Sequence, residues 1–79
     1  MYTRFITYDL KYANTDNYSE LYELIRKYNG EKITESTYKI QTKETWDIFK
    51  NKFFKATKSG DNVKAIVYAN NKMEVRSIR

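Results

Sequence analysis

The sequence predicts an α+β domain with the ferredoxin-like order βαββαβ and an extra C-terminal strand, giving an antiparallel sheet with two helices on one face. Segments that alternate as strands are interrupted by two segments with helical spacing of apolar residues, in that order along the chain. The chain has 79 residues, so residues 1–79 form a single domain. Eight Tyr, four Phe and one Trp supply the apolar area of its core.

The first strand is expected over Tyr2–Leu10, a segment rich in aromatic and β-branched residues. Side chains alternate between the two faces of a strand. One face of this strand therefore presents three apolar side chains: Ile6, Tyr8 and Leu10. The other face presents Phe5, Thr7 and Asp9. An apolar face of this kind indicates a strand near the centre of the sheet.

The first helix is expected to begin at Asn17, because Asn17 followed by Glu20 has the form of a capping box. Apolar residues then recur at helical spacing and predict the face that packs on the core: Tyr18, Leu21, Tyr22, Ile25 and Tyr28. Asn29 and Gly30 favour a left-handed stop at the end of this helix.

Two short strands joined by a tight turn are expected over Glu31–Thr34 and Ser36–Gln41. Thr42 is then a candidate N-cap for a second helix that runs to about Thr57. A helical wheel leaves Ile48 outside the core-facing arc of this helix. Five residues lie on that arc: Trp46, Phe49, Phe53, Phe54 and Ala56.

The last part of the chain predicts a β-hairpin. The Gly and Asp content of Ser59–Asn62 indicates a turn, and Val63–Ala69 is the most continuous apolar strand. Asn70 and Asn71 favour a primed hairpin turn. That turn leads into a final strand with three apolar residues: Met73, Val75 and Ile78.

The composition excludes several classes of chemistry. The chain has no Cys and no His, which excludes a thiol nucleophile, a Ser-His-Asp triad and a zinc-activated water. Any catalysis must rest on Asp, Glu, Tyr, Lys or a hard metal such as Mg²⁺. No long apolar run is present, so neither a membrane span nor a signal peptide is predicted, and a cytoplasmic protein without a membrane partner is expected.

Three short segments resemble a known group of small proteins: Tyr8-Asp9-Leu10, the helical pattern from Tyr18 to Ile25, and the stretch from Glu35 to Ile40. Together they resemble the SinR-like and VapD-like small proteins and, more distantly, the small ferredoxin-like nuclease subunit of the CRISPR adaptation machinery. The resemblance covers about residues 4–69.

This resemblance implies a homodimer in which the Asp9 carboxylates of two chains lie near the two-fold axis. There they hold Mg²⁺ for weak endonuclease cleavage of RNA or DNA, with Asp9 as the catalytic and metal-binding residue. Ser36 and Tyr8 are the supporting residues that the resemblance implies. The residues themselves allow a second interpretation, in which Asp9 caps the loop that follows the strand or simply marks the end of the strand.

The net charge of +5 is concentrated in the second half of the chain, where residues 41–79 hold nine Lys/Arg against four Asp/Glu. This excess is a candidate footprint for RNA or DNA. Candidate phosphate contacts are Lys11, Lys50, Lys55, Lys58 and Lys64. Helical spacing spreads the second-helix lysines around the solvent-facing arc, so an ordinary solvated surface is the alternative.

Two functions of different class stay open at this point. The first is the homodimeric Mg²⁺-dependent nuclease that the resemblance implies. The second is a non-catalytic module of a phage or mobile element that binds a host protein complex through its sheet or edge strand. Aromatic residues on the open face of the sheet could stack bases or be buried by a partner, and burial by a partner is favoured.

Overall fold

The computed structural model describes residues 1–12 and 18–79. It is an α+β domain with a five-stranded antiparallel sheet and two helices, which confirms the predicted fold class. Neither helix in the described part of the chain is long and apolar enough to cross a bilayer. The elements are β1 (Tyr2–Asp9), α1 (Ser19–Lys27), β2 (Glu31–Thr34), β3 (Thr37–Thr42), α2 (Trp46–Ala56), β4 (Asn62–Ala69) and β5 (Lys72–Ser77).

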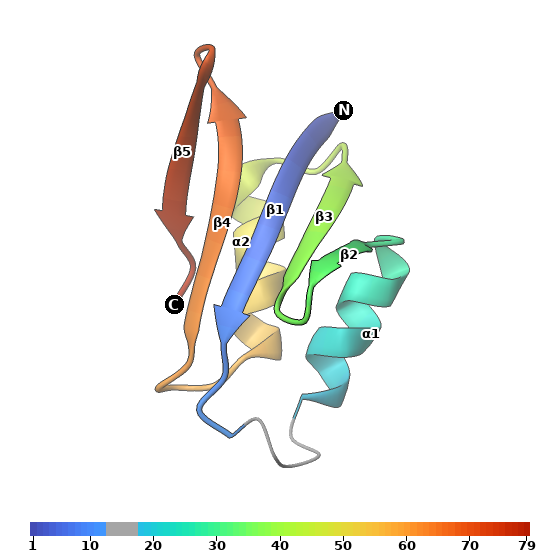
Figure 1. Ribbon diagram of the computed structural model, residues 1–79, viewed down its shortest axis with the longest axis vertical. Coiled ribbons are helices and arrows are strands. Elements are labelled where there is room, and N and C mark those ends of the chain that lie inside the picture. Colours follow the sequence, from blue (N-terminus) through green and yellow to red (C-terminus); the bar gives the residue numbers. More distant parts are fainter. Residues whose placement is uncertain (13–17) are drawn as a thin grey trace.

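The strands lie in the order β2-β3-β1-β4-β5, so β1 is the central strand, as its apolar face predicts. Figure 1 shows the five strands side by side with α2 crossing behind them. The β4–β5 hairpin turns at Asn70 and Asn71, whose φ angles are 52° and 62°. Two consecutive left-handed residues make the primed turn that these residues favour. As a result β5 pairs with β4 of its own chain and forms one edge of the sheet.

The core lies between one face of the sheet and the two helices. Leu21 and Ile25 of α1 and Phe49 and Phe53 of α2 are buried against it. The rings of Phe49 and Phe53 have centroids 4.9 Å apart, and the Tyr28 ring stacks on Phe53 at 5.9 Å. The sheet contributes its helix-facing residues to this core: Ile6, Tyr8, Ile40, Val63, Ala65 and Val67.

Strand β1 follows the predicted alternation, with one charged residue on its buried side. Arg4 is 5% exposed on the face that packs against the helices. Its guanidinium lies between the rings of Tyr2 and Phe49, at 4.7 and 4.8 Å from their centroids, and donates a hydrogen bond of 2.9 Å to the Glu44 carbonyl. Stacked aromatic faces stabilise a cation that has lost much of its water.

Helix α1 departs from the prediction at its start and on one side. It begins at Ser19, with Tyr18 as a cap residue that makes no side-chain capping bond, and the predicted cap Asn17 lies outside the described residues. Tyr22, predicted to face the core, is 43% exposed. It is rotated by about 100° from its neighbour Leu21, which together with Ile25 forms the buried stripe.

The predicted helix stop after α1 is present. Asn29 adopts the left-handed conformation, with φ of 53°. Gly30 follows it, and its amide donates to the Ile25 carbonyl at 3.0 Å. A Cβ atom at Gly30 would lie only 2.8 Å from Cγ2 of Ile25, so the close approach of the two segments requires glycine here.

Helix α2 begins three residues later than predicted, with Thr45 and not Thr42 as its cap residue. Thr42 is the last residue of β3 and pairs with Tyr2 of β1, so it cannot cap a helix. Its hydroxyl accepts a hydrogen bond from the Glu44 amide in the loop that follows. Phe54, predicted to face the core, is 45% exposed. The packed stripe of α2 is set by Phe49 and Phe53, and Phe54 lies about 100° away from it.

The face of the sheet opposite the helices has an exposed apolar surface. Met73 and Val75 of β5 are 63% and 69% exposed, and Tyr68 of β4 is 65% exposed. Phe5 pairs in register with Ile66, which pairs in turn with Val75, so these side chains form one continuous row. We refer to the five residues as the sheet-face strip: Phe5, Ile66, Tyr68, Met73 and Val75.

Candidate functional site

Asp9 lies at the end of β1, on the face of the sheet that no helix covers. Its register partner is Asn62 of β4, and its side chain is exposed. Among the described residues, the Asp9 carboxylate has no hydrogen-bond or ion-pair partner. No capping bond from Asp9 is formed among the described residues, and loop residues 13–17 lie outside them. Asp61 binds the start of the β1–α1 loop, where its Oδ1 accepts the Lys11 amide at 2.8 Å.

The residues that the family resemblance points to lie around one hollow. It has a volume of about 350 Å³ and is lined by Tyr8, Asp9, Leu10, Tyr22, Glu35 and Ser36. The antiparallel pairing of β1 with β3 brings the end of β1 to the β2–β3 turn, where Ser36 lies. The three predicted site residues thus share one part of the surface, although they are far apart in the sequence.

Glu35 is a second carboxylate at this hollow, and apart from its place before Ser36 no sequence pattern predicts it. It forms an exposed ion pair of 3.2 Å with Lys32. An exposed pair of this kind is held weakly. The Glu35 carboxylate can therefore leave Lys32 for another cation.

Tyr8 and Ser36 have structural contacts that limit their chemistry. The Tyr8 amide donates to the Ser36 carbonyl at 3.1 Å, which fixes the β2–β3 turn against β1. The Tyr8 ring stacks on Tyr38, with centroids 6.4 Å apart. Burial, with a further contribution from Tyr38, raises the pKa of Tyr8, so its hydroxyl stays protonated at neutral pH. Both residues therefore position the hollow, and Asp9 contributes a charged group that has no partner among the described residues.

A single chain does not supply a metal site of its own. The described residues contain no group of three or more His, Cys, Asp or Glu side chains placed to hold a metal ion. Mg²⁺ prefers oxygen ligands and is bound by one or two carboxylates with waters and substrate phosphates. The Asp9 carboxylate fits this preference as one ligand, and a second must come from another molecule.

The five candidate phosphate-binding lysines are distributed over different parts of the molecule. Lys11 and Lys58 lie near one end, over the rings of Tyr12 and Tyr18. Lys55 lines a groove between α1 and α2, and Lys50 lies elsewhere on α2. Lys64 lies on the opposite layer, in β4, and donates to the Ser77 hydroxyl at 3.1 Å.

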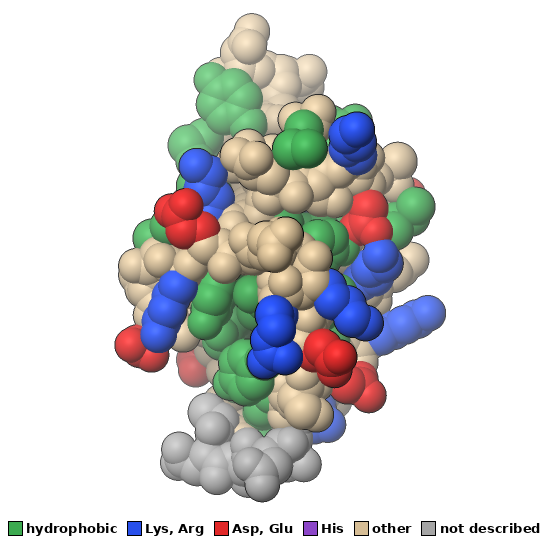
Figure 2. Space-filling model, turned by 90° about the vertical axis from the view of Figure 1, so that its right-hand side faces the viewer, with side chains coloured by type: hydrophobic (Ala, Val, Ile, Leu, Met, Phe, Trp, Pro, Cys, Tyr) green, Lys and Arg blue, Asp and Glu red, His purple; other side chains and the backbone are tan. Residues whose placement is uncertain are grey.

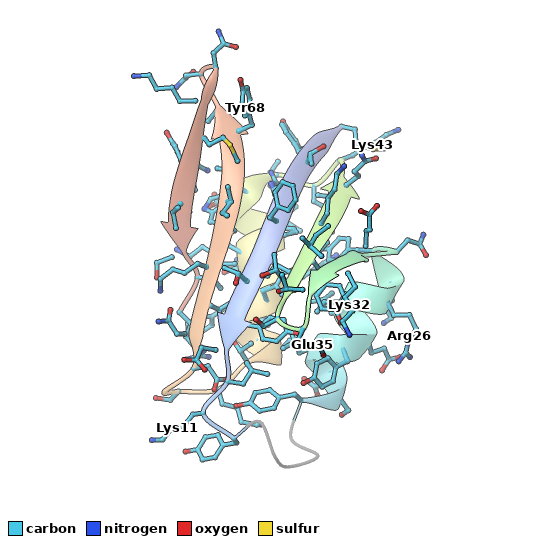
Figure 3. All side chains as sticks on the ribbon, in the orientation of Figure 1. Lys11, Arg26, Lys32, Glu35, Lys43 and Tyr68 are labelled. Carbon is cyan, nitrogen blue, oxygen red and sulfur yellow. The ribbon has the colours of Figure 1, made fainter. Side chains whose placement is uncertain are left out.

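This distribution does not form one track for a nucleic-acid backbone. Figure 3 shows Lys11 at the end of the sheet far from the β4–β5 hairpin, where Tyr68 lies. On the side of the molecule that presents α1 and β2, Figure 2 shows basic and acidic side chains interspersed. Mixed signs of charge are typical of an ordinary solvated surface.

Comparison with known proteins finds no family model, no curated protein and no solved structure that matches this chain.

Proposed function

We propose that this protein is a homodimeric binding module whose sheet-face strip packs against a second copy of the chain. The observation that supports this is the strip itself, in which three large apolar side chains are more than 60% exposed next to each other. Contiguous exposed apolar surface of this kind marks interaction sites in soluble proteins. A chain of 79 residues also gains more from such a contact than a larger domain does, because its own core is small.

The charges on the same face favour a second copy as the occupant. Lys39 pairs in register with both Phe5 and Glu31, so all three lie on the uncovered face. Lys64 and Asp9 lie on this face as well, at positions set by the alternation of β4 and β1. The face therefore holds two acidic and two basic residues around the strip. A two-fold axis sets such a surface against itself, and opposite charges can then pair.

Strand β5 adds a second means of self-association. It is an edge strand, and its outer side has no partner strand in the described chain. Unpaired backbone N–H and C=O groups on an exposed edge readily pair with another strand. Pairing at this edge extends the sheet in its own plane, so it is a contact distinct from the face-to-face packing of the strip.

The experiment measures molar mass by light scattering over a range of micromolar concentrations. We expect the wild type to reach about twice the chain mass of 9.5 kDa. Val75→Glu should remain folded and lose the dimer, because a carboxylate in the strip must be desolvated on association. Ile48→Glu is the matched control, since Ile48 is 50% exposed on the helix layer, and it should dimerise like the wild type.

A wild type that stays at the monomer mass, or a Val75→Glu variant that dimerises normally, would contradict the proposal. Binding of a host protein to the strip of a monomeric chain is the outcome that supports the other class of function, a phage or mobile-element interaction module. That binding should be lost in Val75→Glu and retained in Ile48→Glu.

A second candidate function is Mg²⁺-dependent cleavage of RNA or DNA by the dimer. The observation that favours it is the position of Asp9, which is exposed on the same face as the strip and has no described side-chain partner. Association through that face brings two Asp9 carboxylates to the same interface. The family resemblance further implies that the two carboxylates lie near the two-fold axis, with Ser36 and Tyr8 beside them.

Cleavage of short RNA and DNA strands, with and without Mg²⁺, tests this second function. We expect Mg²⁺-dependent products with the wild type and none with Asp9→Asn. Asp47→Asn removes an exposed carboxylate from α2 and serves as the control that keeps activity. Cleavage that survives in Asp9→Asn, or that does not need Mg²⁺, would not depend on a metal held by Asp9 and would contradict this second function.

A further inference from the structure

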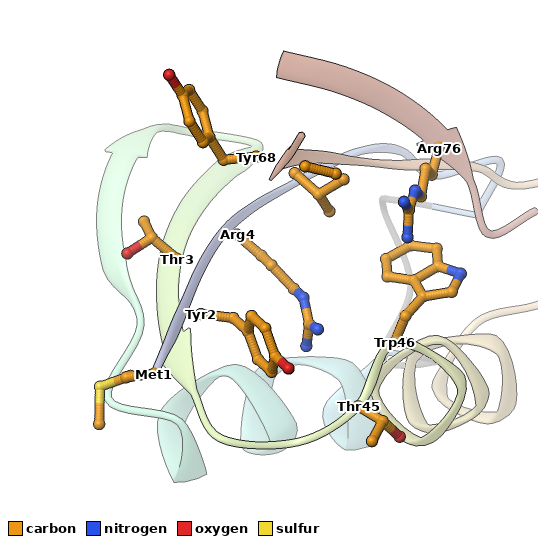
Figure 4. Close-up of a pocket in the computed structure, with 10 residues that line it drawn as sticks. Met1, Tyr2, Thr3, Arg4, Thr45, Trp46, Tyr68 and Arg76 are labelled. Atoms are coloured by element: carbon orange, nitrogen blue, oxygen red, sulfur yellow. The ribbon is translucent and has the colours of Figure 1, made fainter. Parts of the chain in front are cut away.

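A second pocket lies at the other end of the sheet from Asp9, beside the first turn of α2. Its volume is about 550 Å³, within the range of small-molecule sites. Figure 4 shows Arg4 and Arg76 entering it from the sheet, with Tyr2 and Trp46 at its sides. None of the described residues that line it is acidic.

Arg4 provides a largely desolvated cation in this pocket. It is 5% exposed, and burial lowers the pKa of its guanidinium, with a smaller contribution in the same direction from Arg76. A guanidinium has five N–H donors, and only one bond from Arg4, to the Glu44 carbonyl, is formed within the described chain. The remaining donors have no hydrogen-bond partner among the described residues, and Arg4 lines the pocket that an anion would enter.

Arg76 provides the second cation. Its guanidinium lies over the Trp46 ring, 5.1 Å from the centroid. Its Nε and Nη2 both donate to Oε2 of Glu74, at 3.1 and 3.0 Å. Glu74 is thus the acidic residue bonded to Arg76. That ion pair is partly exposed, and the third nitrogen, Nη1, has no partner among the described residues. The bonds to Glu74 therefore orient the Arg76 guanidinium, and its Nη1 donors remain for a ligand.

The backbone of α2 adds positive potential at the same place. The helix has eleven residues and begins at Trp46, and its cap residue Thr45 makes no side-chain capping bond. Both residues line the pocket. The first N–H groups of a helix have no partner within the helix and favour anions. Asp47, the acidic residue of this turn, does not line the pocket.

We propose that this pocket binds a nucleoside 5′-monophosphate group, with the phosphate on Arg4 and Arg76 and the base against the Tyr2 ring. Two guanidinium groups that line one pocket beside a helix N-terminus suit the several acceptor oxygens of a phosphate monoester. The Arg4 guanidinium covers one face of the Tyr2 ring, and Tyr2 is still 53% exposed, so a base can stack on the other face. The group can come from a free mononucleotide or from the 5′-phosphorylated end of a single strand.

The pocket shares one residue with the sheet-face strip, Tyr68, but its two arginines lie away from the proposed dimer contact. Arg4 and Arg76 lie on the helix-facing side of β1 and β5, whereas the strip lies on the other side of the sheet. Nucleotide binding can therefore fail while the dimer forms, and a Val75→Glu monomer should bind the nucleotide as the wild type does.

Trp46 gives a direct readout, because it is the only tryptophan in the chain. Its fluorescence is followed while AMP, adenosine or inorganic phosphate is added to the full-length protein, with calorimetry as a second measurement. We expect AMP to bind saturably and about tenfold more tightly than adenosine, since adenosine lacks the charge-assisted bonds. Inorganic phosphate should compete with AMP. A short oligonucleotide with a 5′ phosphate, compared with its 5′-hydroxyl form, distinguishes a strand end from a free nucleotide.

Arg76→Gln should weaken AMP binding about tenfold and leave the fold intact, because Arg76 lies at an edge strand. Lys72→Gln removes a cation from the same strand outside the pocket and should bind AMP like the wild type. The proposal is overturned if neither fluorescence nor calorimetry detects AMP, if AMP and adenosine bind equally, or if Lys72→Gln loses as much affinity as Arg76→Gln.

Discussion

The Tyr18 hydroxyl donates a hydrogen bond of 2.6 Å to Oδ1 of Asp61, across 43 residues of sequence. The same carboxylate accepts the backbone amides of Lys11 at 2.8 Å and Lys58 at 2.7 Å. Asp61 is 6% exposed. Its burial opposes ionisation, but the bonds from Tyr18 and the two amides outweigh burial and lower the pKa of Asp61. One buried carboxylate therefore joins the β1–α1 loop to the α2–β4 turn.

Asp61→Asn should destabilise the protein by about 1 to 3 kcal/mol, because an amide nitrogen cannot accept the Lys58 N–H and leaves a donor unsatisfied. For a domain of this size, each 1 kcal/mol corresponds to a fall in Tm of about 4 to 8 °C. Asp9→Asn is the matched control and should not lower the Tm, since Asp9 has no described partner. Equal loss of stability in the two variants would contradict this assignment.

The stabilising effect of Asp61 should disappear in acid. Its pKa is lowered in the folded state relative to an unfolded value of about 3.9, so its contribution is complete above that value and is lost as pH falls through the folded pKa. The difference in Tm between wild type and Asp61→Asn should therefore be constant near neutral pH and narrow below about pH 4. The pKa of Glu44 is also lowered, because hydrogen bonds from Lys52 and Tyr28 outweigh the effect of its burial. Glu44 is present in both proteins, so it does not affect the difference in Tm.

Phe53→Ala and Phe54→Ala should differ strongly in the free energy of unfolding. Phe53 is fully buried, and its truncation should cost about 3 to 5 kcal/mol or prevent folding. Phe54 is 45% exposed, with the Arg79 guanidinium 3.9 Å from its ring centroid, so its truncation should cost about 1 kcal/mol. Urea titrations measure both. Similar losses in the free energy of unfolding for the two substitutions would mean that a different face of α2 packs against the core.

Mg²⁺ should raise the Tm of the wild type if two Asp9 carboxylates share a site. A ligand that binds the folded protein stabilises it by about 1 kcal/mol at roughly five times its Kd. In the absence of metal, Asp9→Asn should melt at the same temperature as the wild type or higher, because repulsion between the carboxylates is removed. The variant should show no Mg²⁺ response. A Tm shift of equal size in both proteins would place the metal elsewhere.

Local pattern alone determined the element order, the faces of β1 and the sharp reversals. Alternation along β1 requires only the pleat of the strand, so Ile6 and Tyr8 lie on the buried side as predicted. Asn29, Asn70 and Asn71 adopt left-handed conformations that few other residues tolerate, and the turns therefore occur where these residues stand. These features depend on residues close together in the chain.

The tertiary structure decided which part of each apolar helix arc is buried and which distant groups meet. The arcs of α1 and α2 are wider than the stripe that the sheet covers, so Tyr22 and Phe54 are left exposed. Asp61 becomes a central carboxylate only because strand pairing brings residues 43 and 50 positions away to it. Arg4 and Arg76 meet at one pocket for the same reason, since both β1 and β5 flank β4. Contacts of such long range leave no periodic signal, because they depend on the relative placement of whole strands and helices.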